Sequence, residues 1–264
     1  MERPTKNQVR KGPMKPGQNG KNYFPIELAS ATFHATLGNS KVGNKVGCYN
    51  IAIEYTCMHD CDCYKSGKCY ACQGCYNFQS NQQKYTENFK YYMENDAATL
   101  AGNITEYIVK NNLSLFRYFT CGDIPGRKFM ETMVKVALDN PSVKFWAYTK
   151  KYHIVNRWID ENGKLPENLV IIFSHWLNDD GTYYPMENPH NMPTSEFIPL
   201  GKEELTKTVT HICPCSDPNV KATCATCDHH CYNLKPGESM ALLEHSTQRT
   251  KERDRAIKAA HEKL

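Results

Sequence analysis

Short apolar runs alternate with amphipathic segments between residues 85 and 212. In the amphipathic segments the apolar residues recur every three or four positions, which is the spacing of a helix that buries one face. The runs between them hold five to seven residues, many of them β-branched or aromatic, as in buried strands. Such alternation predicts a parallel sheet with helices packed on it. We therefore expect a single α/β domain, built either as an incomplete (β/α) barrel or as an open, mostly parallel sheet.

The same pattern predicts where each element lies. Strands are expected over residues 48–56, 115–120, 143–149, 169–174 and 208–212. Helices are expected around residues 85–92 and 100–108, over 125–140, and from about 154 to 163. Residues 176–200 contain four prolines and are expected to form a long loop. The domain is expected to span residues 23–245 and to be followed by an exposed helix over 246–264.

Residues 1–22 form a basic arm that is rich in proline and glycine. They carry a net charge of +5, whereas the rest of the chain carries −1. A segment of this composition cannot bury enough apolar surface to fold, so a disordered arm is expected. A basic arm can contact nucleic acid, and a solvated leader without a partner is the alternative interpretation.

No apolar run approaches the roughly 20 residues that a transmembrane helix needs. The N-terminal residues also lack the apolar core of a secretory signal. We therefore expect no membrane contact and a cytoplasmic location. Disulfides are rare in reducing cytosol, where a dense set of cysteines more often indicates metal binding or catalysis.

Eleven of the thirteen cysteines fall into two clusters of 19 residues each. Thiolates spaced two to four residues apart can converge on one metal ion or iron–sulfur cluster within a tight loop. The odd total excludes complete internal pairing as disulfides, so metal ligands are expected in both clusters. The first cluster consists of Cys57, Cys61, Cys63, Cys69, Cys72 and Cys75, and the second of Cys213, Cys215, Cys224, Cys227 and Cys231.

Spacing alone leaves the metal of the second cluster open. Zinc prefers four ligands, often supplied as pairs of cysteines two to four residues apart. His211, His229 and His230 are alternative ligands in this part of the chain. Iron–sulfur clusters also take thiolates from short loops. Zinc and iron–sulfur are therefore two alternatives for the second cluster.

Polar or metal-binding residues follow each predicted strand. In β/α proteins the carboxyl ends of the strands carry the chemistry. The first cysteine cluster follows the strand that ends at Thr56, and Cys213 follows the last strand. We expect these ends to form one shared mouth, although ordinary polar turns are the alternative. The residues expected to bind a cofactor there are Thr120, Gly122, Asp123, Thr149, Lys150, Ser174 and His175.

A series of short motifs runs in order from about Tyr23 to His245. The motifs are Thr56-Cys57, Cys69-Tyr70-Ala71, Phe116-Arg117, Gly122-Asp123-Ile124, Phe145, Tyr148-Thr149-Lys150, Pro166-Glu167-Asn168-Leu169, Ser174, Asn188-Pro189, Pro193, and the last cysteine set followed by Gly237 and His245. In this order they resemble the Gene product 88 family of phage and bacterial proteins. The resemblance implies a place in a bacterial or phage-infected cell.

That family in turn resembles radical S-adenosylmethionine enzymes. Those enzymes bind a [4Fe–4S] cluster through three cysteines in the loop after the first barrel strand, and a motif after the second strand binds the methionine end of the cofactor. The resemblance implies that the loop from Cys57 to Cys75 holds the cluster and that Asp123 accepts from the cofactor's amino group. The set from Cys213 to Cys231 would then hold a second metal.

The cysteine spacing departs from the Cys-x3-Cys-x2-Cys pattern of that superfamily. Cys61 is followed by Cys63 after one residue, so the three cluster ligands are not identified by the sequence. Two functions follow as hypotheses. The first is an iron–sulfur enzyme that reductively cleaves S-adenosylmethionine and acts on an unknown substrate. The second is a non-enzymatic module of phage origin, stabilised by zinc or iron–sulfur, that binds nucleic acid or a protein partner.

Overall fold

The computed structural model describes most of the chain between Asn22 and Glu244. The described residues are 10–11, 22–39, 42–58, 69, 71, 74–176, 182–183, 185–198, 209–217 and 220–244. Three cysteines of the first cluster, Cys61, Cys63 and Cys72, lie outside this part of the chain. So do the expected C-terminal helix and most of the expected basic arm.

Strands and helices alternate over the central part of the chain. The strands are β1 (Arg10–Lys11), β2 (Asn22–Tyr23), β3 (Ala35–Leu37), β4 (Val46–Tyr49), β5 (Leu115–Tyr118), β6 (Lys144–Thr149), β7 (Leu169–Trp176), β8 (Thr194–Ile198), β9 (His211–Ile212) and β10 (Ser239–Leu243). The α-helices are α1 (Ile53–Thr56), α3 (Gln79–Glu94), α4 (Ala97–Lys110), α5 (Arg127–Asp139) and α6 (Tyr152–Asn162). Short 3-10 helices are η2 (Ile26–Leu28), η4 (Gly74–Asn77), η6 (Pro214–Ser216) and η7 (Cys231–Asn233).

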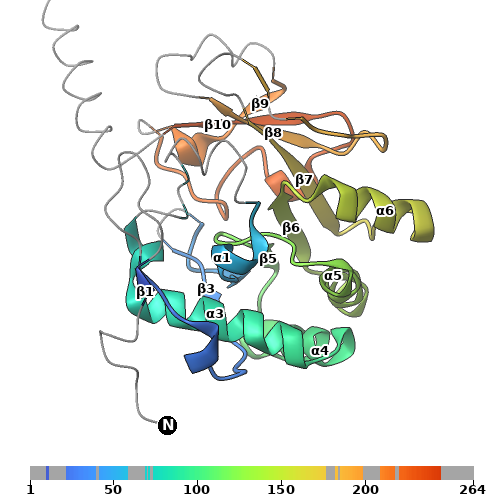
Figure 1. Ribbon diagram of the computed structural model, residues 1–264. Coiled ribbons are helices and arrows are strands. Elements are labelled where there is room, and N and C mark those ends of the chain that lie inside the picture. Colours follow the sequence, from blue (N-terminus) through green and yellow to red (C-terminus); the bar gives the residue numbers. More distant parts are fainter. Residues whose placement is uncertain are drawn as a thin grey trace, which may run out of the picture.

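Within the described residues, eight strands form one sheet that does not close into a barrel (Figure 1). Their order is β3-β4-β5-β6-β7-β8-β10-β9. Only the β3–β4 pair is antiparallel among them, and every other pair is parallel. The prediction of an open, mostly parallel α/β sheet is therefore confirmed. A separate two-stranded ladder joins β1 to β2.

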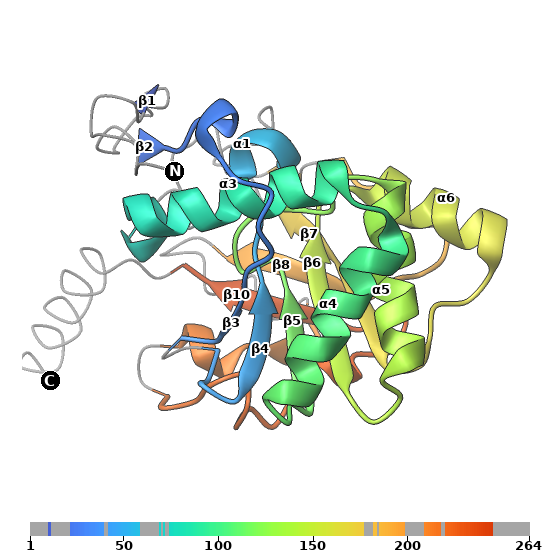
Figure 2. The same ribbon diagram turned by 90° about the horizontal axis from the view of Figure 1, so that it is seen from below.

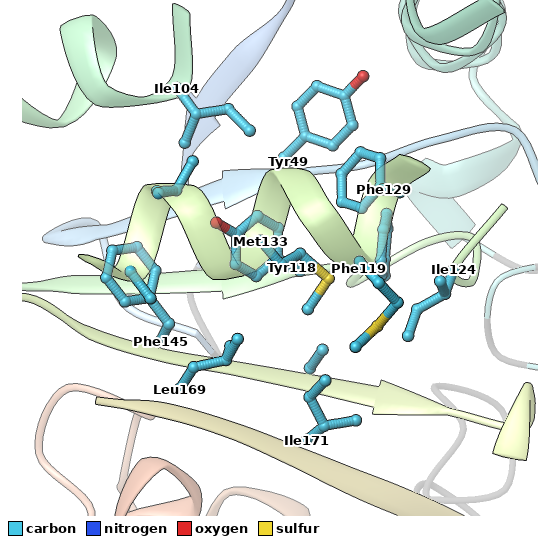
Figure 3. Close-up of a cluster of buried hydrophobic side chains, with 14 of the residues drawn as sticks. Tyr49, Ile104, Tyr118, Phe119, Ile124, Phe129, Met133, Phe145, Leu169 and Ile171 are labelled. Carbon is cyan, nitrogen blue, oxygen red and sulfur yellow. The ribbon is translucent and has the colours of Figure 1, made fainter. Parts of the chain in front are cut away.

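The helices α4, α5 and α6 cover one face of this sheet. Tyr118 and Phe145 point from the strands toward Phe129 and Met133 of α5 (Figure 3). Phe116 belongs to the same cluster, and all five side chains are fully buried. Because successive residues of a strand point to opposite faces, the neighbours of these strand residues lie on the other side. The helical segments predicted from apolar spacing are confirmed within a few residues of their expected bounds.

The second face of the sheet is covered by the chain that connects β9 to β10. Cys48, Trp146 and Ile172 point to this side and pack with Cys213 and Leu234 of the connection. The second cysteine cluster therefore lies against the sheet itself. This differs from the expected position at the carboxyl ends of the strands.

The carboxyl ends of β4 and β5 are crossed by α3 (Figure 2). The Tyr49 hydroxyl donates to the Asn88 carbonyl of α3 at 3.2 Å, and the Ala52 amide donates to the Tyr85 carbonyl at 3.2 Å. The helix thus closes this end of the sheet over the start of the first cysteine cluster.

The strand expected over residues 48–56 is wrong from Asn50 onward. The strand ends at Tyr49, and Ile53–Thr56 form the short helix α1. The β-branched and aromatic residues of this stretch favour a strand. Their burial against Cys121 and Tyr85 instead decides the local conformation, because tertiary contacts override propensity.

Three strands of the eight-stranded sheet were not expected, and one is shorter than expected. The strand β8 lies inside the predicted loop 176–200, and neither β3 nor β10 was predicted. The strand predicted over 208–212 is reduced to His211–Ile212. The strand β8 begins level with the end of β6, since Phe173 of β7 pairs with Thr149 on one side and with Thr194 on the other.

No helix in the part of the chain that the structure describes is long and apolar enough to cross a membrane.

Candidate metal centre

Four thiols of the second cluster meet on the second face of the sheet, which the β9–β10 connection covers. The Cys215 thiol lies within hydrogen-bonding reach of the thiols of Cys213, Cys224 and Cys227. These four residues, called the thiol quartet below, come from a Cys-x-Cys pair and a Cys-x2-Cys pair. The Cys213 amide donates to the Ala241 carbonyl of β10 at 2.9 Å, which fixes the first pair to the sheet.

Three thiols of the quartet have lowered pKa values, whereas the pKa of Cys215, which donates to them, is raised. The hydrogen bond from Cys215 lowers the pKa of Cys227 to about 5 and that of Cys224 to about 6, and Arg117 adds to the effect at Cys224. The pKa of Cys213 is lowered by the same thiol. Because the thiolate is the form that binds metal, the lowered pKa values of Cys213, Cys224 and Cys227 favour these three thiols as metal ligands.

A half-buried cation, Arg117 of β5, lies between the quartet and the sheet. The Arg117 Nη1 atom is 4.0 Å from Cys224 Sγ, and its guanidinium carbon is 5.0 Å from the centre of the Tyr148 ring. The Tyr148 hydroxyl donates to Cys231 Sγ at 2.8 Å. Burial raises the pKa of Cys231 to about 12, so this fifth thiol stays protonated behind the quartet.

The donor set fits a thiophilic metal. Four thiolates match a structural zinc site or an iron–sulfur cluster. No group of three or more His, Cys, Asp or Glu side chains is arranged to hold a metal ion, as far as the described residues go. The metal at the quartet, and the choice between zinc and iron–sulfur, therefore stay predictions.

The first cysteine cluster lies at the carboxyl edge of the sheet, as far as it is described. Cys57 follows α1 directly, and Cys57 and Cys69 pack with Cys121 and Tyr85. Cys69 also packs with Trp176, near the end of β7. The cluster therefore follows β4 and reaches across several strand ends, whereas the quartet lies elsewhere.

Asp123 joins the ends of β5 and β6. Its Oδ1 atom accepts from Thr149 Oγ1 at 2.5 Å and from the Ile124 amide at 2.7 Å, and its Oδ2 atom accepts from the Lys150 amide at 3.0 Å. Burial raises the pKa of this carboxyl despite the three donors. The structure thus brings Asp123, Thr149 and Lys150 together, while their role toward a cofactor stays a prediction.

Of the other residues expected at the shared mouth of the strand ends, two follow a strand and two lie within one. Thr120 and Gly122 lie in the turn after β5, where the Thr120 hydroxyl donates to Asn50 Oδ1 at 2.7 Å. Ser174 and His175 lie inside β7 and not after it, because this strand continues to Trp176. His175 stacks on Tyr183 with ring centres 4.1 Å apart, and burial lowers its pKa.

A cavity of about 250 Å³ lies beside the first cysteine cluster, and sequence reasoning missed it. It opens between the β3–β4 hairpin and α3. Of the expected site residues, only Thr120 and Cys75 line it. Asn50 is a polar residue directly after β4, which is where binding residues of a parallel sheet are expected. The prediction missed it because it placed Asn50 inside a strand over residues 48–56. Its lining also includes His34, Thr36, Cys48, Asn50, Lys84 and Tyr85.

The comparisons with known proteins give one match. A family model described as Gene product 88 matches residues 28–194, more than half of the chain. The matched range holds β3 to β7 and the first cysteine cluster and ends before the quartet. No curated protein and no solved structure matches the chain.

Proposed function

The chain belongs to the Gene product 88 family, and we propose that it is an iron–sulfur protein resembling radical S-adenosylmethionine enzymes. In this proposal the cysteine loop after β4 binds a [4Fe–4S] cluster. The cluster supplies an electron for the reductive cleavage of S-adenosylmethionine, and the substrate is unknown. The set from Cys213 to Cys231 holds a second metal.

One observation carries this proposal. Cys57 and Cys69 lie at the carboxyl edge of the sheet and pack with Cys121, which belongs to the same turn as Gly122 and Asp123. In open α/β sheets, ligands bind at the carboxyl ends of the strands. The strands β4 to β8 also follow each other in sequence order, as they do in a β/α barrel.

Three thiolates of the loop would hold the cluster and leave one iron open to the amino acid end of the cofactor. Both oxygens of Asp123 already accept hydrogen bonds within the protein. Asp123 therefore holds two strand ends in register here, and a contact with the cofactor's amino group would add to those bonds. Thr149 and Lys150, which it binds, are fixed beside it.

The position of the thiol quartet favours a second candidate function. The quartet lies on the sheet face, where Cys224 contacts Arg117 and the fifth thiol, Cys231, contacts Tyr148, so the β9–β10 connection is tied to both residues. A zinc ion there would stabilise the fold without any chemistry of its own. The chain would then be a binding module, and its basic arm would supply salt-dependent affinity for nucleic acid.

Anaerobic purification followed by iron, sulfide and zinc analysis separates the two functions. We expect iron and sulfide in equal amounts, together with reductive cleavage of S-adenosylmethionine. The double variant Cys57→Ser, Cys69→Ser should lose cleavage and most of the iron bound by the loop. The double variant Cys224→Ser, Cys227→Ser should lose only the second metal.

Cys48→Ala is the matched control, because this variant removes a buried thiol that belongs to neither cluster. Its metal content should equal that of the unmodified chain. Zinc alone, with no iron after reconstitution, would refute the iron–sulfur proposal and favour the binding module. A cluster without cofactor cleavage would contradict the radical enzyme and leave an electron-transfer or sensing protein.

A further inference from the structure

The proposed function does not use the cavity between the β3–β4 hairpin and α3. Its volume of about 250 Å³ lies just below the roughly 300–1,000 Å³ of pockets that hold drug-sized molecules, so it suits a small ligand. Cys75 of the first cysteine cluster forms part of its wall. A molecule held there would lie beside that loop.

The buried side-chain amide of Asn50 lines this cavity, and its Nδ2 donor is unpaired among the described residues. Asn50 is only 8 % exposed, and its Oδ1 atom accepts from the Cys121 amide at 3.0 Å and from Thr120 Oγ1 at 2.7 Å. Because a backbone N–H can only donate, the bond from Cys121 fixes the orientation of the side-chain amide. Its Nδ2 group makes no hydrogen bond to any residue in the described part of the chain, and Asn50 lines the cavity.

Two further donors share this cavity. Tyr85 is 8 % exposed, and burial, reinforced by the nearby Cys121, raises the pKa of its phenol. The hydroxyl therefore stays protonated, and it has no hydrogen-bond acceptor among the described residues. Lys84, one position earlier on α3, is exposed at the rim and forms no ion pair with a described residue.

The charge of the wall favours an anion. The described lining includes Lys84 and His34 and contains no aspartate or glutamate. Glu87, which binds His34 Nε2 at 2.6 Å, is not part of the lining. Buried polar groups in native proteins are nearly always hydrogen-bonded, so donors turned into a cavity indicate a ligand that is rich in acceptors.

We propose that this cavity binds a small organic anion whose acidic group accepts hydrogen bonds from Asn50 and Tyr85 and faces the ammonium of Lys84. Binding of this anion needs no metal, so the inference goes beyond the proposed function. Because the cavity lies beside Cys75, small organic anions are the substrate class that we assign to the proposed enzyme. Only this assignment of the substrate rests on the proposed function; binding of the anion does not.

Calorimetric titration of the full chain tests the site. The probes are glutarate and glycerol 3-phosphate, which separate a carboxylate from a phosphate ligand, and their neutral analogues 1,5-pentanediol and glycerol. We expect saturable binding of at least one anion and of neither neutral analogue. Lys84→Met and Asn50→Asp should each weaken that binding by about tenfold or more, since a hydrogen bond to a charged group is lost or a like charge is added.

Lys110→Met is the control, because it removes the same charge from the exposed end of α4, away from the cavity. Its affinity should be unchanged. Because Lys84 is exposed, Lys84→Met should fold normally. This variant therefore tests anion binding even if Asn50→Asp does not fold. The absence of saturable anion binding, or equal affinity in Lys84→Met and the unmodified chain, would overturn the proposal. Anion binding by a chain that holds only zinc would support the cavity while the iron–sulfur proposal fails.

Discussion

Arg117 is the residue that connects the sheet with the thiol quartet. Its guanidinium lies on the ring of Tyr148 and near the sulfur of Cys224. Four thiolates around a divalent ion leave a net negative charge on the site. A cation held beneath it in a poorly solvated position offsets that charge more strongly than a surface lysine would.

Replacing Arg117 should therefore weaken metal binding at the quartet. We expect Arg117→Met to lower the metal affinity by about 10–100-fold, the usual effect of losing a group that supports metal ligands. Competition with a chromophoric chelator measures this affinity. Arg157→Met is the control, because Arg157 is an exposed residue of α6 that pairs with Glu161 at 2.9 Å. Equal affinity in both variants would contradict a role for the Arg117 guanidinium.

At this scale the sequence indicated the cysteine clusters and missed the cavity. Cysteine spacing is a local signal, so both clusters could be recognised from the chain alone, but spacing did not single out the quartet, which pairs Cys213 with Cys215 and leaves Cys231 outside. Asn50, Lys84 and Tyr85 carry no such spacing. They meet because α3 crosses the end of β4, and only the tertiary fold brings them together.

Among the elements, the turn after β5 depends most on one residue. Gly122 has a φ of +96°, and a Cβ atom added there would lie 2.4 Å from the Ile51 carbonyl oxygen. This close approach lets the Ile51 amide donate to the Cys121 carbonyl at 3.0 Å. The turn therefore sets the position of Asp123 as well as that of the chain after β4.

Gly122→Ala should destabilise the protein by about 2–4 kcal/mol, because backbone strain at such a φ costs about 1–3 kcal/mol and the contact with Ile51 adds to it. Urea unfolding measures this loss. Gly102→Ala is the matched control, since an added Cβ in α4 meets no atom within 4 Å. That variant should be stabilised by up to about 1 kcal/mol. If Gly122→Ala left the free energy of unfolding unchanged, the turn would tolerate a Cβ atom at this position, and the prediction would be wrong.

The predictions are wrong for the strands that form through pairing with adjacent strands and not through a local sequence pattern. The helices α3 to α6 follow from apolar spacing within each segment, and so do the central strands β5, β6 and β7. The strands β8 and β10 have few residues and follow prolines or a charged stretch, so no local pattern marks them. They form because each completes the hydrogen bonds of a strand already in the sheet.

For the whole molecule, the last described strand is an internal one. Although β10 comes last along the chain, it pairs with β8 on one side and with β9 on the other. Met240 and Ala241 are completely buried, and Leu243 donates through its amide to Ser216 Oγ at 3.0 Å. Removal of β10 would therefore leave β8 unpaired on one side and β9 without a neighbour.

A chain that ends at residue 238 should lose at least about 3 kcal/mol of stability, because burial of Met240 and Leu243 contributes about 1.5–3 kcal/mol each. Urea unfolding followed by circular dichroism gives the value. A chain that ends at Glu244 is the control, since it keeps every described strand, and it should unfold like the full chain. If the two truncated chains unfold alike, β10 does not contribute to the cooperative core.

The place of β10 also sets an order of events during synthesis. The ribosome releases the quartet before it releases Ser239–Leu243, yet β9 has no partner in the sheet until those residues arrive. The thiols therefore leave the exit tunnel before the surface that fixes them is complete. The metal proposed for the quartet, if it needs all four thiols in their final arrangement, would therefore bind only after translation has passed Leu243.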